Sequence, residues 1–317
     1  MKTIAILSLI ASVGLLYVAF APQETSFDRE FKTFIATYGK NYGSTEEMSF
    51  RRLVFNANMQ KAVELGKLNP LAKFGVTLFA DQTEEEMAAR MGAVDPGRSR
   101  ANIEFHTDTS KTLDFLDWSG AMQPVQDQGS CGSCWAFSAT AAFEGRHHIH
   151  MDDETEKYSE QEALDCSSSM YGCNGGWYEA VWDMVSKDEF CSLSSYKYTA
   201  RKGSCQKTTC DKKALDTGYK FISKDEASMH DALKSGPISI AVDASTWSTY
   251  QGGILTRESC GTGMNHAVVI VAYNDEDNTW KVRNSWSPSW GEEGHIRLRY
   301  GENTCNLLYK PAYPTFD

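Results

Sequence analysis

Cys134 lies at the start of a predicted helix, in the stretch QDQGSCGSCWAF of residues 126–137. Residues 135–144 are rich in alanine, with a few bulky aromatic side chains, and Gly145 follows them. This composition predicts a buried helix that begins near Ser133 and that the glycine ends. The unpaired N–H groups and the positive end of the helix dipole would favour a thiolate at Cys134, which would be a strong nucleophile.

Two other interpretations of Cys134 stay open from this stretch alone. The residue could be one half of a disulfide, or Cys131-Gly-Ser-Cys134 could be a redox pair. A cysteine nucleophile needs a base close to it and a partner that holds the ring of that base in place. The rest of the chain must therefore supply those two groups.

His266 and Asn284 are the candidates for the base and its partner. His266 begins the apolar run HAVVIV, and Asn284 follows another β-rich run. They lie about 130 and about 150 residues after Cys134, a separation known for one class of cysteine nucleophile.

The cysteines and the N-terminus indicate a secretory route. A basic start, an apolar run over residues 4–18 and the ending AFA at residues 19–21 predict a signal peptide over residues 1–21, since a membrane anchor would need about 20 apolar residues. The compartment beyond it is oxidising, where nine cysteines imply disulfides with one thiol left over. All nine follow residue 130, so the region before them must fold without covalent links.

Length and charge narrow the class of protein. A chain of 317 residues is long enough for two units, or for a domain with an added region. Its net charge of −11 argues against a nucleic-acid partner, because phosphates would be repelled. No other stretch is apolar enough to span a bilayer, so we expect no membrane anchor once the signal is removed.

The region after the signal is predicted to be a helical module. An aromatic stripe at helical spacing predicts core packing, and its members are Phe27, Phe31, Phe34 and Tyr38. Ser44 and Glu47 have the spacing of a capping box at the start of a long helix, on which Glu47 can pair with Arg51. Residues 74–81, FGVTLFAD, alternate enough to predict a short strand.

A change in composition then divides the chain. From Gly92 to Ser110 the sequence has no periodicity and carries glycine, proline, arginine and serine, which predicts an exposed linker and a site of proteolysis. After it, helical patterns precede a loop at residues 172–176 that needs positive φ, and β-rich runs follow at residues 238–242, 266–273 and 280–283. A site built from both halves would lie in a cleft between them.

Five motifs in order resemble the papain-like cysteine proteases, in particular the cathepsin L-like branch. They are QGSCGSCWAF, SEQEALDC, GCNGG, NHAVVIVAY and NSWSPSWGEEG, and the resemblance covers the chain after the signal. It implies an α+β fold of two lobes, a helical left lobe and a β-barrel-like right lobe with a cleft between them, preceded by a mainly helical inhibitory propeptide. The implied boundaries are 1–21 for the signal, 22–111 for the propeptide with a linker at about 92–111, and 112–317 for the mature domain.

The resemblance assigns catalytic roles by position. Cys134 would be the nucleophile, His266 its base, and Asn284 the group that orients the imidazole. Gln128 would be the side-chain donor of an oxyanion hole, next to the backbone N–H of Cys134. Trp286 would shield the contact between Asn284 and His266 from water.

The resemblance also implies how the thiols pair. The family pattern joins Cys131 to Cys173, Cys166 to Cys205 and Cys260 to Cys305. Cys191 and Cys210 remain, and we infer a fourth bridge between them. Cys134 is then free, and the redox interpretation is disfavoured because Cys131 already has a partner.

The propeptide pattern is present with departures. The ERFNIN pattern is matched at Glu47, Arg51, Phe55 and Asn58, whereas Ala62 and Gly66 stand where Ile and Asn are usual. Thr77 replaces the asparagine of the family's G-x-N-x-F-x-D. These departures concern the tightness of inhibition more than the fold, and processing is expected near Thr112.

Substrate selection is implied at a hydrophobic S2 pocket beside the nucleophile. The substrate-binding residues implied by alignment are Gly175, Gly176, Trp177, Tyr178, Ala241, Met264, Asn265 and Ala267, with Trp290 on the leaving-group side. Lys310 stands where the family places the pocket floor. It could accept an acidic side chain at P2, or it could extend to solvent and line the pocket only with its stem.

Two features limit other activities. His147, His148 and His150 cluster on the predicted helix, but no further ligand has a suitable spacing, so we expect a solvated helix end, no metal and no other cofactor. No insertion like the occluding loop of cathepsin B follows GCNGG, which favours an open cleft and endopeptidase action.

The resemblance thus implies a cysteine endopeptidase made as a zymogen. Its expected partners are protein and peptide substrates, its own propeptide and cystatin-type inhibitors, and we expect a monomer in the secretory pathway, in a lysosome-like acidic vesicle or outside the cell. The alternative is a non-catalytic binding or inhibitor protein on the same scaffold. Such a protein would typically have lost the cysteine or the histidine, and this chain has both.

Overall fold

The protein is described here by a computed structural model that covers residues 26–97, 103–104, 115–151 and 156–316. The chain forms two compact units, one up to Asn56 and one from Ala57 onward. The predicted signal peptide and the processing site expected near Thr112 lie outside the described residues.

Aromatic packing holds the first unit together. It contains α2 (Ser26–Tyr38) and the start of α3 (Thr45–Leu68). The rings of Phe31 and Phe34 are buried, with centroids 5.3 and 5.2 Å from that of Phe55. The predicted aromatic stripe is therefore confirmed as core packing at Phe31 and Phe34, whereas Phe27 and Tyr38 are only half-buried.

The start of α3 is capped nearly as predicted. The Ser44 hydroxyl accepts the N–H of Glu47 at 3.1 Å, while the Glu47 carboxylate accepts the N–H of Gly43 at 2.8 Å instead of that of Ser44. The return bond of the capping box has thus moved by one residue. Glu47 also pairs with Arg51 at 3.9 Å, as expected for positions i and i+4.

The second unit begins inside α3 and contains the remaining helices. Its α-helices are α4 (Glu84–Ala88), α5 (Cys134–Met151), α6 (Glu160–Cys166), α7 (Glu179–Val185) and α8 (Glu226–Leu233). Its 3₁₀ turns are η1 (Ser119–Ala121), η2 (Gly172–Asn174), η3 (Trp247–Thr249), η4 (Arg257–Ser259) and η5 (Thr304–Asn306). In η2 the backbone of Gly172 has φ of 65°, and Gly175 just after it has φ of 119°, as predicted for this loop.

The predicted end of the helix after Cys134 was wrong. α5 continues past Gly145 to Met151. A Cβ at Gly145 would lie 2.6 Å from Sδ of Met122 and 2.8 Å from Cγ of Pro237. The glycine is therefore needed because other segments pack closely on the helix, and it does not end the helix.

One large sheet forms the β-rich part of the second unit. Its strands are β1 (Ala72–Phe74), β2 (Ile103–Glu104), β3 (Leu116–Asp117), β6 (Gly218–Ile222), β7 (Ile238–Val242), β8 (Tyr250–Leu255), β9 (His266–Asn274), β10 (Thr279–Arg283), β11 (His295–Arg299) and β12 (Tyr309–Thr315). A separate pair joins β4 (Phe190–Cys191) to β5 (Lys212–Ala214). The main order is β1-β8-β11-β10-β9-β7-β12-β6-β2, with β3 on β9, and this path is open among the described residues.

The strand predicted over residues 74–81 is mostly a turn. Only β1 is extended, and it adds an antiparallel edge strand to β8, pairing Ala72 with Gly253. After it, the Thr77 hydroxyl accepts the N–H of Phe79 and donates to the carbonyl of Ser248. This local side-chain bonding replaces the ladder of a strand.

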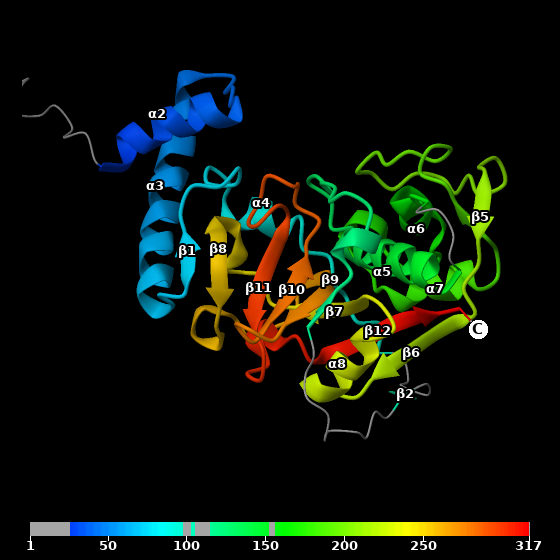
Figure 1. The fold of residues 1–317 in the computed structure, drawn as a ribbon. Coiled ribbons are helices and arrows are strands. Elements are labelled where there is room, and N and C mark those ends of the chain that lie inside the picture. Colours follow the sequence, from blue (N-terminus) through cyan, green and yellow to red (C-terminus); the bar gives the residue numbers. More distant parts are fainter. Residues whose placement is uncertain (1–25, 98–102, 105–114, 152–155, 317) are drawn as a thin grey trace, which may run out of the picture. The chain divides into compact units, whose positions relative to one another are not determined.

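β9 lies between two hydrophobic cores. Ala267, Val269 and Val271 belong to the core around α5, α6 and α7. Val268 and Ile270 belong to the second core, inside the sheet, because successive strand residues point to opposite faces. Figure 1 shows α5, α6 and α7 grouped beside β9, with β10, β11 and β8 following on its other side. The predicted order, helical first and β-rich second, is confirmed, and His266 stands at the start of the strand that both cores share.

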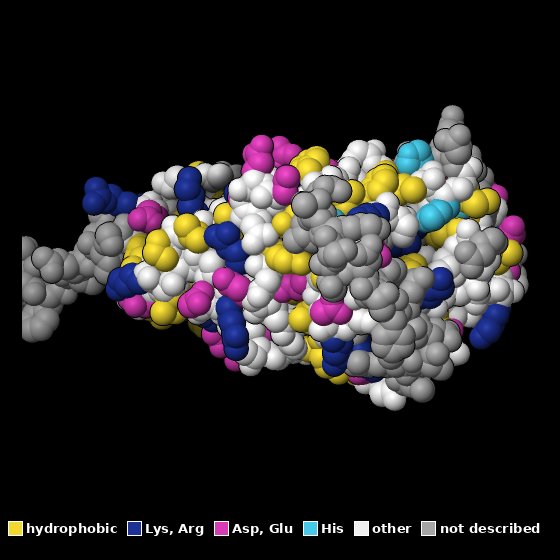
Figure 2. All heavy atoms as spheres, turned by 60° about the horizontal axis from the view of Figure 1, so that its bottom comes forward, with side chains coloured by type: hydrophobic (Ala, Val, Ile, Leu, Met, Phe, Trp, Pro, Cys, Tyr) yellow, Lys and Arg dark blue, Asp and Glu magenta, His cyan; other side chains and the backbone are white. Residues whose placement is uncertain are grey.

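The exposed surface is of mixed charge. On the face drawn in Figure 2, acidic and basic side chains of the described residues are interspersed. None of the helices in the described part of the chain is long and apolar enough to cross a bilayer.

Candidate active site

Cys134 is the first residue of α5 and is fully buried. It is the free cysteine, because the other eight form four disulfides. The pairs are the ones expected from the sequence, namely Cys131–Cys173, Cys166–Cys205, Cys191–Cys210 and Cys260–Cys305. The first of them ties the loop before Cys134 to the loop at residues 172–176, so the thiol has a rigid surrounding.

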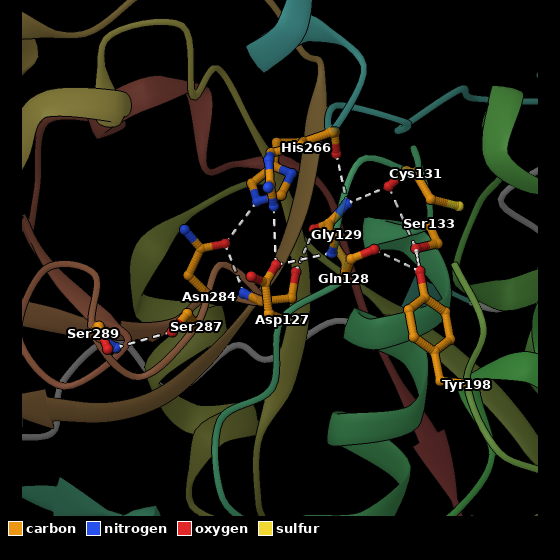
Figure 3. A network of polar contacts seen from close by, with 12 residues as sticks. Asp127, Gln128, Gly129, Cys131, Ser133, Tyr198, His266, Asn284, Ser287 and Ser289 are labelled. Carbon is orange, nitrogen blue, oxygen red and sulfur yellow. Dashed lines mark hydrogen bonds and ion pairs between the residues drawn. The ribbon is translucent and has the colours of Figure 1, made fainter. Parts of the chain in front are cut away.

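His266 and Asn284 are brought together by two antiparallel strands. His266 begins β9, and Asn284 follows the end of β10, which pairs with β9. His266 Nε2 lies 2.8 Å from Asn284 Oδ1, a contact visible in Figure 3. Since Asn284 Oδ1 can only accept, this bond places the proton of the neutral ring on Nε2 and leaves Nδ1 able to accept a proton.

Nonpolar rings close off this pair. The Trp286 ring centroid lies 4.8 Å from that of His266, and the Trp247 centroid lies 6.2 Å from it. His266 Nδ1 is buried and has no hydrogen-bond partner among the described residues. Trp290 does not join Trp177 in the core around α5, α6 and α7, which is called the helical-side core from here on. It packs with Trp286 and Trp247 in the second core.

Gln128 is held so that its amide points along the loop before Cys134. Its Oε1 accepts the Ser285 hydroxyl at 2.6 Å, and its Nε2 donates to the carbonyl of Cys131 at 2.8 Å. Tyr198, which sequence reasoning missed, donates its hydroxyl to the Gln128 carbonyl at 2.8 Å and contacts Ser133 at 2.6 Å (Figure 3). The second Nε2 bond, of 2.7 Å, goes to the carbonyl of Arg90.

The segment at residues 90–95, called the covering segment from here on, lies over Cys134. The Gly92 N–H donates to Cys134 Sγ at 3.2 Å. The Gly92 carbonyl accepts from the Gly176 N–H at 2.9 Å, and the next two residues donate their N–H groups to Asn265 and Gly176. A Cβ at position 92 would lie 1.8 Å from the carbonyl oxygen of Gly132, so only glycine allows this approach.

Arg90 anchors the segment on its other side. Its guanidinium lies 4.6 Å from the ring centroid of Phe79 and pairs with Asp127 at 2.9 Å. Phe79 in turn meets Trp286 edge-on, with centroids 5.7 Å apart. Gly92 and Ala93, which the sequence assigned to an exposed linker, are therefore buried against the site.

Burial decides the protonation of the covered site. It raises the pKa of the Cys134 thiol to about 11, although backbone N–H groups such as that of Gly92 act in the opposite direction. It lowers the pKa of His266 to about 4, against the effect of the hydrogen bond to Asn284. At neutral pH the covered site thus holds a neutral thiol and a neutral imidazole, because desolvation outweighs the expected effect of the helix dipole.

The expected substrate-binding residues fall into one region, apart from Trp290. Trp177, Tyr178, Ala241 and Ala267 share the helical-side core, and Met264 packs against it. Gly176 bonds through its backbone to Gly92 and Val94 of the covering segment, and the Asn265 carbonyl accepts from Ala93 there. Gly175 lies close to the same segment, because a Cβ there would be 2.5 Å from Cγ2 of Val94.

Lys310 lies beside Trp177 in the same region, and it forms an ion pair with Asp95 that the sequence did not predict. Its Nζ lies 2.6 Å from Asp95 Oδ1, and the Tyr309 hydroxyl donates to Asp95 Oδ2 at 2.7 Å. Asp95 was missed because an acid in a segment without periodicity carries no signal of its own, and Tyr309, the first residue of β12, was not singled out.

The histidine cluster is only partly solvated. His147 is buried, with its ring 5.7 Å from that of Phe143 and 5.5 Å from that of Phe316, so the expectation of a wholly solvated helix end was wrong there. Within the described ranges no group of three or more His, Cys, Asp or Glu is placed to hold a metal ion.

Comparison with known proteins places two sequence families on the chain. The profile of the family described as "Papain family cysteine protease" matches residues 109–315, and that of the "Cathepsin propeptide inhibitor domain" matches residues 31–87. Digestive cysteine proteinase 3 of Homarus americanus is 36% identical over 324 residues, covering 96% of this chain and 99% of that protein. Fruit bromelain of Ananas comosus is 32% identical over 306 residues, covering 90% and 86%.

Solved structures of precursors have the same fold. Digestive procathepsin L 3 of the Tenebrio molitor larval midgut matches with a TM-score of 0.79 and 29% identity, over 92% of this chain and 99% of that one. A recombinant stem bromelain precursor matches with a TM-score of 0.84 and 30% identity, over 92% and 100%.

Proposed function

Because this chain belongs to the papain family of cysteine proteases, we propose that Cys134, His266 and Asn284 are its catalytic residues. The protein is a cysteine endopeptidase made as a zymogen. The observation that carries the assignment of residues is the 2.8 Å bond from His266 to Asn284, because it leaves Nδ1 of a shielded imidazole as the atom that can take a proton. The single free thiol of the chain supplies the nucleophile.

The proposed reaction begins when the covering segment has left. His266 Nδ1 takes the proton of Cys134, and the thiolate attacks the carbonyl carbon of the substrate peptide bond. The carbon–sulfur bond forms, the peptide bond breaks, and the imidazolium gives its proton to the leaving amine. Water, deprotonated by the same imidazole, then cleaves the thioester and restores the thiol.

Gln128 is proposed to stabilise the oxyanion. Its Nε2 and the backbone N–H of Cys134 would donate to the oxygen on which charge develops during attack. In the precursor a carbonyl oxygen, that of Arg90, already lies 2.7 Å from this Nε2. The Ser285 hydroxyl fixes the amide in that orientation, so the donor needs no rearrangement.

The apolar residues beside the covering segment are proposed to bind substrate. Trp177, Tyr178, Ala241, Met264 and Ala267 would form the apolar walls that contact the stem of the substrate side chain at P2. Gly176 and Asn265 would bind the substrate backbone, since they bond to the backbone of the covering segment in the precursor. Gly175 would leave room for the substrate beside them, since a Cβ there would lie 2.5 Å from Cγ2 of Val94 in the precursor. Trp286 would keep water from the contact between His266 and Asn284, and Trp290 would border the leaving-group side.

The propeptide is the protein's own inhibitor. We place the signal at residues 1–21, the propeptide at 22–111 and the mature enzyme at 112–317, with processing near Thr112. Cystatin-type inhibitors as further partners, a monomeric state, and an acidic vesicle or the extracellular space as the destination are part of the proposal. They are supported by the secreted, cathepsin-like character of the sequence.

Acid maturation of the full-length precursor tests the assignment. The purified wild type and a Cys134→Ala variant are acidified, and maturation is followed by mass while a fluorogenic peptide reports cleavage. The wild type should shorten to a chain that starts near Thr112 and should become active, whereas the variant should do neither. Activity that survives in Cys134→Ala would remove the proposed nucleophile.

A further inference from the structure

We propose that Lys310 and Tyr309 form a carboxylate-binding subsite that selects an acidic side chain of the substrate, and that Asp95 occupies this subsite in the precursor. The inference rests on the proposed function, because it requires that substrate takes the place of the covering segment. It specifies the substrate class, which the apolar residues of the pocket leave undefined.

The two donors hold both oxygens of one carboxylate. Lys310 Nζ lies 2.6 Å from Asp95 Oδ1, and the Tyr309 hydroxyl lies 2.7 Å from Oδ2. The N–H of Gly97 also donates to Oδ1, at 2.8 Å, and belongs to the propeptide itself. The donors that remain when the propeptide leaves are therefore a cation and a hydroxyl, spaced for a carboxylate.

Lys310 does not extend to solvent in this structure. Its side chain is 7% exposed and that of Asp95 is 14% exposed. The Lys310 Nζ lies 6.0 Å from the ring centroid of Trp177, and the Tyr178 hydroxyl donates to the Lys310 carbonyl. The lysine is thus held between aromatic side chains with its ammonium directed at the bound carboxylate.

The backbone conformation of Lys310 indicates that the surrounding structure holds this residue in place. Its φ is 46°, in the left-handed region that residues with a Cβ seldom adopt. Residues held in such a conformation persist only where the surrounding structure imposes it, and they are concentrated at binding sites. Here the neighbouring Tyr309 and Lys310 both direct polar atoms to one carboxylate.

The position of Asp95 relative to the nucleophile makes it a stand-in for substrate. It lies on the same short segment as Gly92, whose N–H contacts Cys134 Sγ, and Ala93 between them bridges to Gly176. A chain bound along the cleft beside Cys134 can therefore place an acidic side chain on Lys310. When the propeptide leaves, the ammonium loses its counter-ion and faces the open site. An acidic side chain of the substrate restores the pair.

Matched peptides measure this selection directly. Three fluorogenic peptides differ only at P2, the position assigned to this pocket by the sequence resemblance, and carry Glu, Gln or Leu there. They are assayed at about pH 6, above the ordinary pKa of glutamate. Glu and Gln have nearly the same size, so their ratio of kcat/KM reports the charge. We expect the mature wild type to prefer Glu over Gln by about tenfold or more, as charged hydrogen bonds allow.

Two variants assign the preference to the two donors. Lys310→Met keeps the length of the stem without its charge and should lower the Glu/Gln ratio to about one. Tyr309→Phe should lower the ratio by a smaller factor. Lys224→Met is the matched control, because Lys224 is exposed and its Nζ lies 5.4 Å from the Tyr309 ring centroid. It removes a nearby positive charge that does not contact Asp95, and it should leave the ratio as in the wild type.

The outcomes separate this inference from the proposed function. Cleavage of the Leu peptide with a wild-type Glu/Gln ratio of one or less overturns the subsite and leaves the protease assignment intact. A preference for Glu that persists in Lys310→Met, or that Lys224→Met abolishes equally, also overturns it. Failure to cleave any of the three peptides, or cleavage by Cys134→Ala, contradicts the proposed function instead.

Discussion

The amide nitrogen of Gly92 lies 3.2 Å from the sulfur of Cys134, so the backbone at Gly92 directly covers this thiol. The contact is possible because Gly92 has no side chain: a Cβ would lie 1.8 Å from the carbonyl oxygen of Gly132. The two residues are 42 positions apart in the chain. The coverage of Cys134 therefore depends on a close backbone approach at one glycine.

Replacement of Gly92 by alanine should uncover the thiol. The methyl group would force the segment away from Gly132. Cys134 in the Gly92→Ala precursor should therefore react with iodoacetamide at neutral pH at least about tenfold faster than in the wild type. A tenfold change corresponds to a loss of about 1.4 kcal/mol in the free energy that holds the segment over Cys134. The measurement is the mass-detected rate of alkylation. Gly66→Ala in α3 is the control, since nothing lies within 4 Å of its added Cβ. Equal rates in the wild type and Gly92→Ala would show that the glycine is not required for closure.

Truncation of Phe79 should weaken the anchor of the propeptide. Phe79 is buried against Trp286 and lies under the guanidinium of Arg90. Phe79→Ala should lower the free energy of unfolding of the Cys134→Ala precursor by about 3–5 kcal/mol, the usual cost for a buried phenylalanine. Urea unfolding gives this value, and Leu68→Ala, at a side chain 59% exposed, should change it by less than about 0.5 kcal/mol. Similar values for the two variants would contradict the anchor.

Acid should destabilise the covered site through His266. Burial lowers the pKa of this histidine to about 4 from an ordinary value of 6.5, so its contribution to stability is present above pH 6.5 and is lost as the pH falls toward 4. Between these two pH values the unfolded chain binds a proton on this histidine and the folded protein does not. The resulting loss in the free energy of unfolding is about 3 kcal/mol in full.

Comparison of variants isolates this effect from other groups. Burial raises the pKa of Glu162 to about 7 and that of Asp216 to about 8, and their effect on stability has the opposite sign. We therefore compare urea unfolding between pH 7 and pH 4.5 for the Cys134→Ala precursor with and without His266→Gln. The added substitution should flatten the loss at low pH, whereas His148→Gln should not. The same pH slope with and without His266→Gln would rule out this contribution.

Removal of the Gln128 amide should slow the chemical step. One oxyanion donor typically contributes about 10²–10³ in kcat, so Gln128→Ala should lower kcat of the mature enzyme by about that factor with little change in KM. Steady-state kinetics on one peptide give both constants. Gln206→Ala, at an exposed residue, is the control. A loss confined to KM would assign Gln128 to ground-state binding of the substrate.

Much of the candidate site was predictable because its chemistry is carried by residue types in a fixed order. Cys134 before a helix, His266 at the start of a strand and Asn284 after the next one were identified without coordinates, and the structure brings His266 and Asn284 within 2.8 Å. The thiol pairs also agreed: the family pattern gave three of them, and the fourth, Cys191–Cys210, joined the two cysteines that remained beside Cys134. Local patterns predicted less about a glycine or an acid whose role depends on contact with a segment far away in the chain.

The wrong predictions of local structure share one physical cause, which is contact with segments far away in the chain. Gly145 was taken as the end of a helix, but it is needed for close packing against Met122 and Pro237. The alternating pattern of residues 74–81 became a turn because Thr77 bonds to its neighbours and to Ser248. Gly92 and Ala93 were assigned to an exposed linker because a segment that pairs with distant residues has no periodicity of its own.

The sequence by itself indicated which groups are available for chemistry: one thiol left over from the disulfides, one imidazole with an amide partner, and a lysine where the family resemblance implies the floor of a pocket. Only the tertiary structure decided their state. It places residues 90–95 across Cys134, Gln128 and Lys310, which makes the thiol and the imidazole neutral and gives the lysine a carboxylate partner. Protonation and pairing depend on burial and on contacts between segments far apart in the chain, and these arise only when the chain has folded.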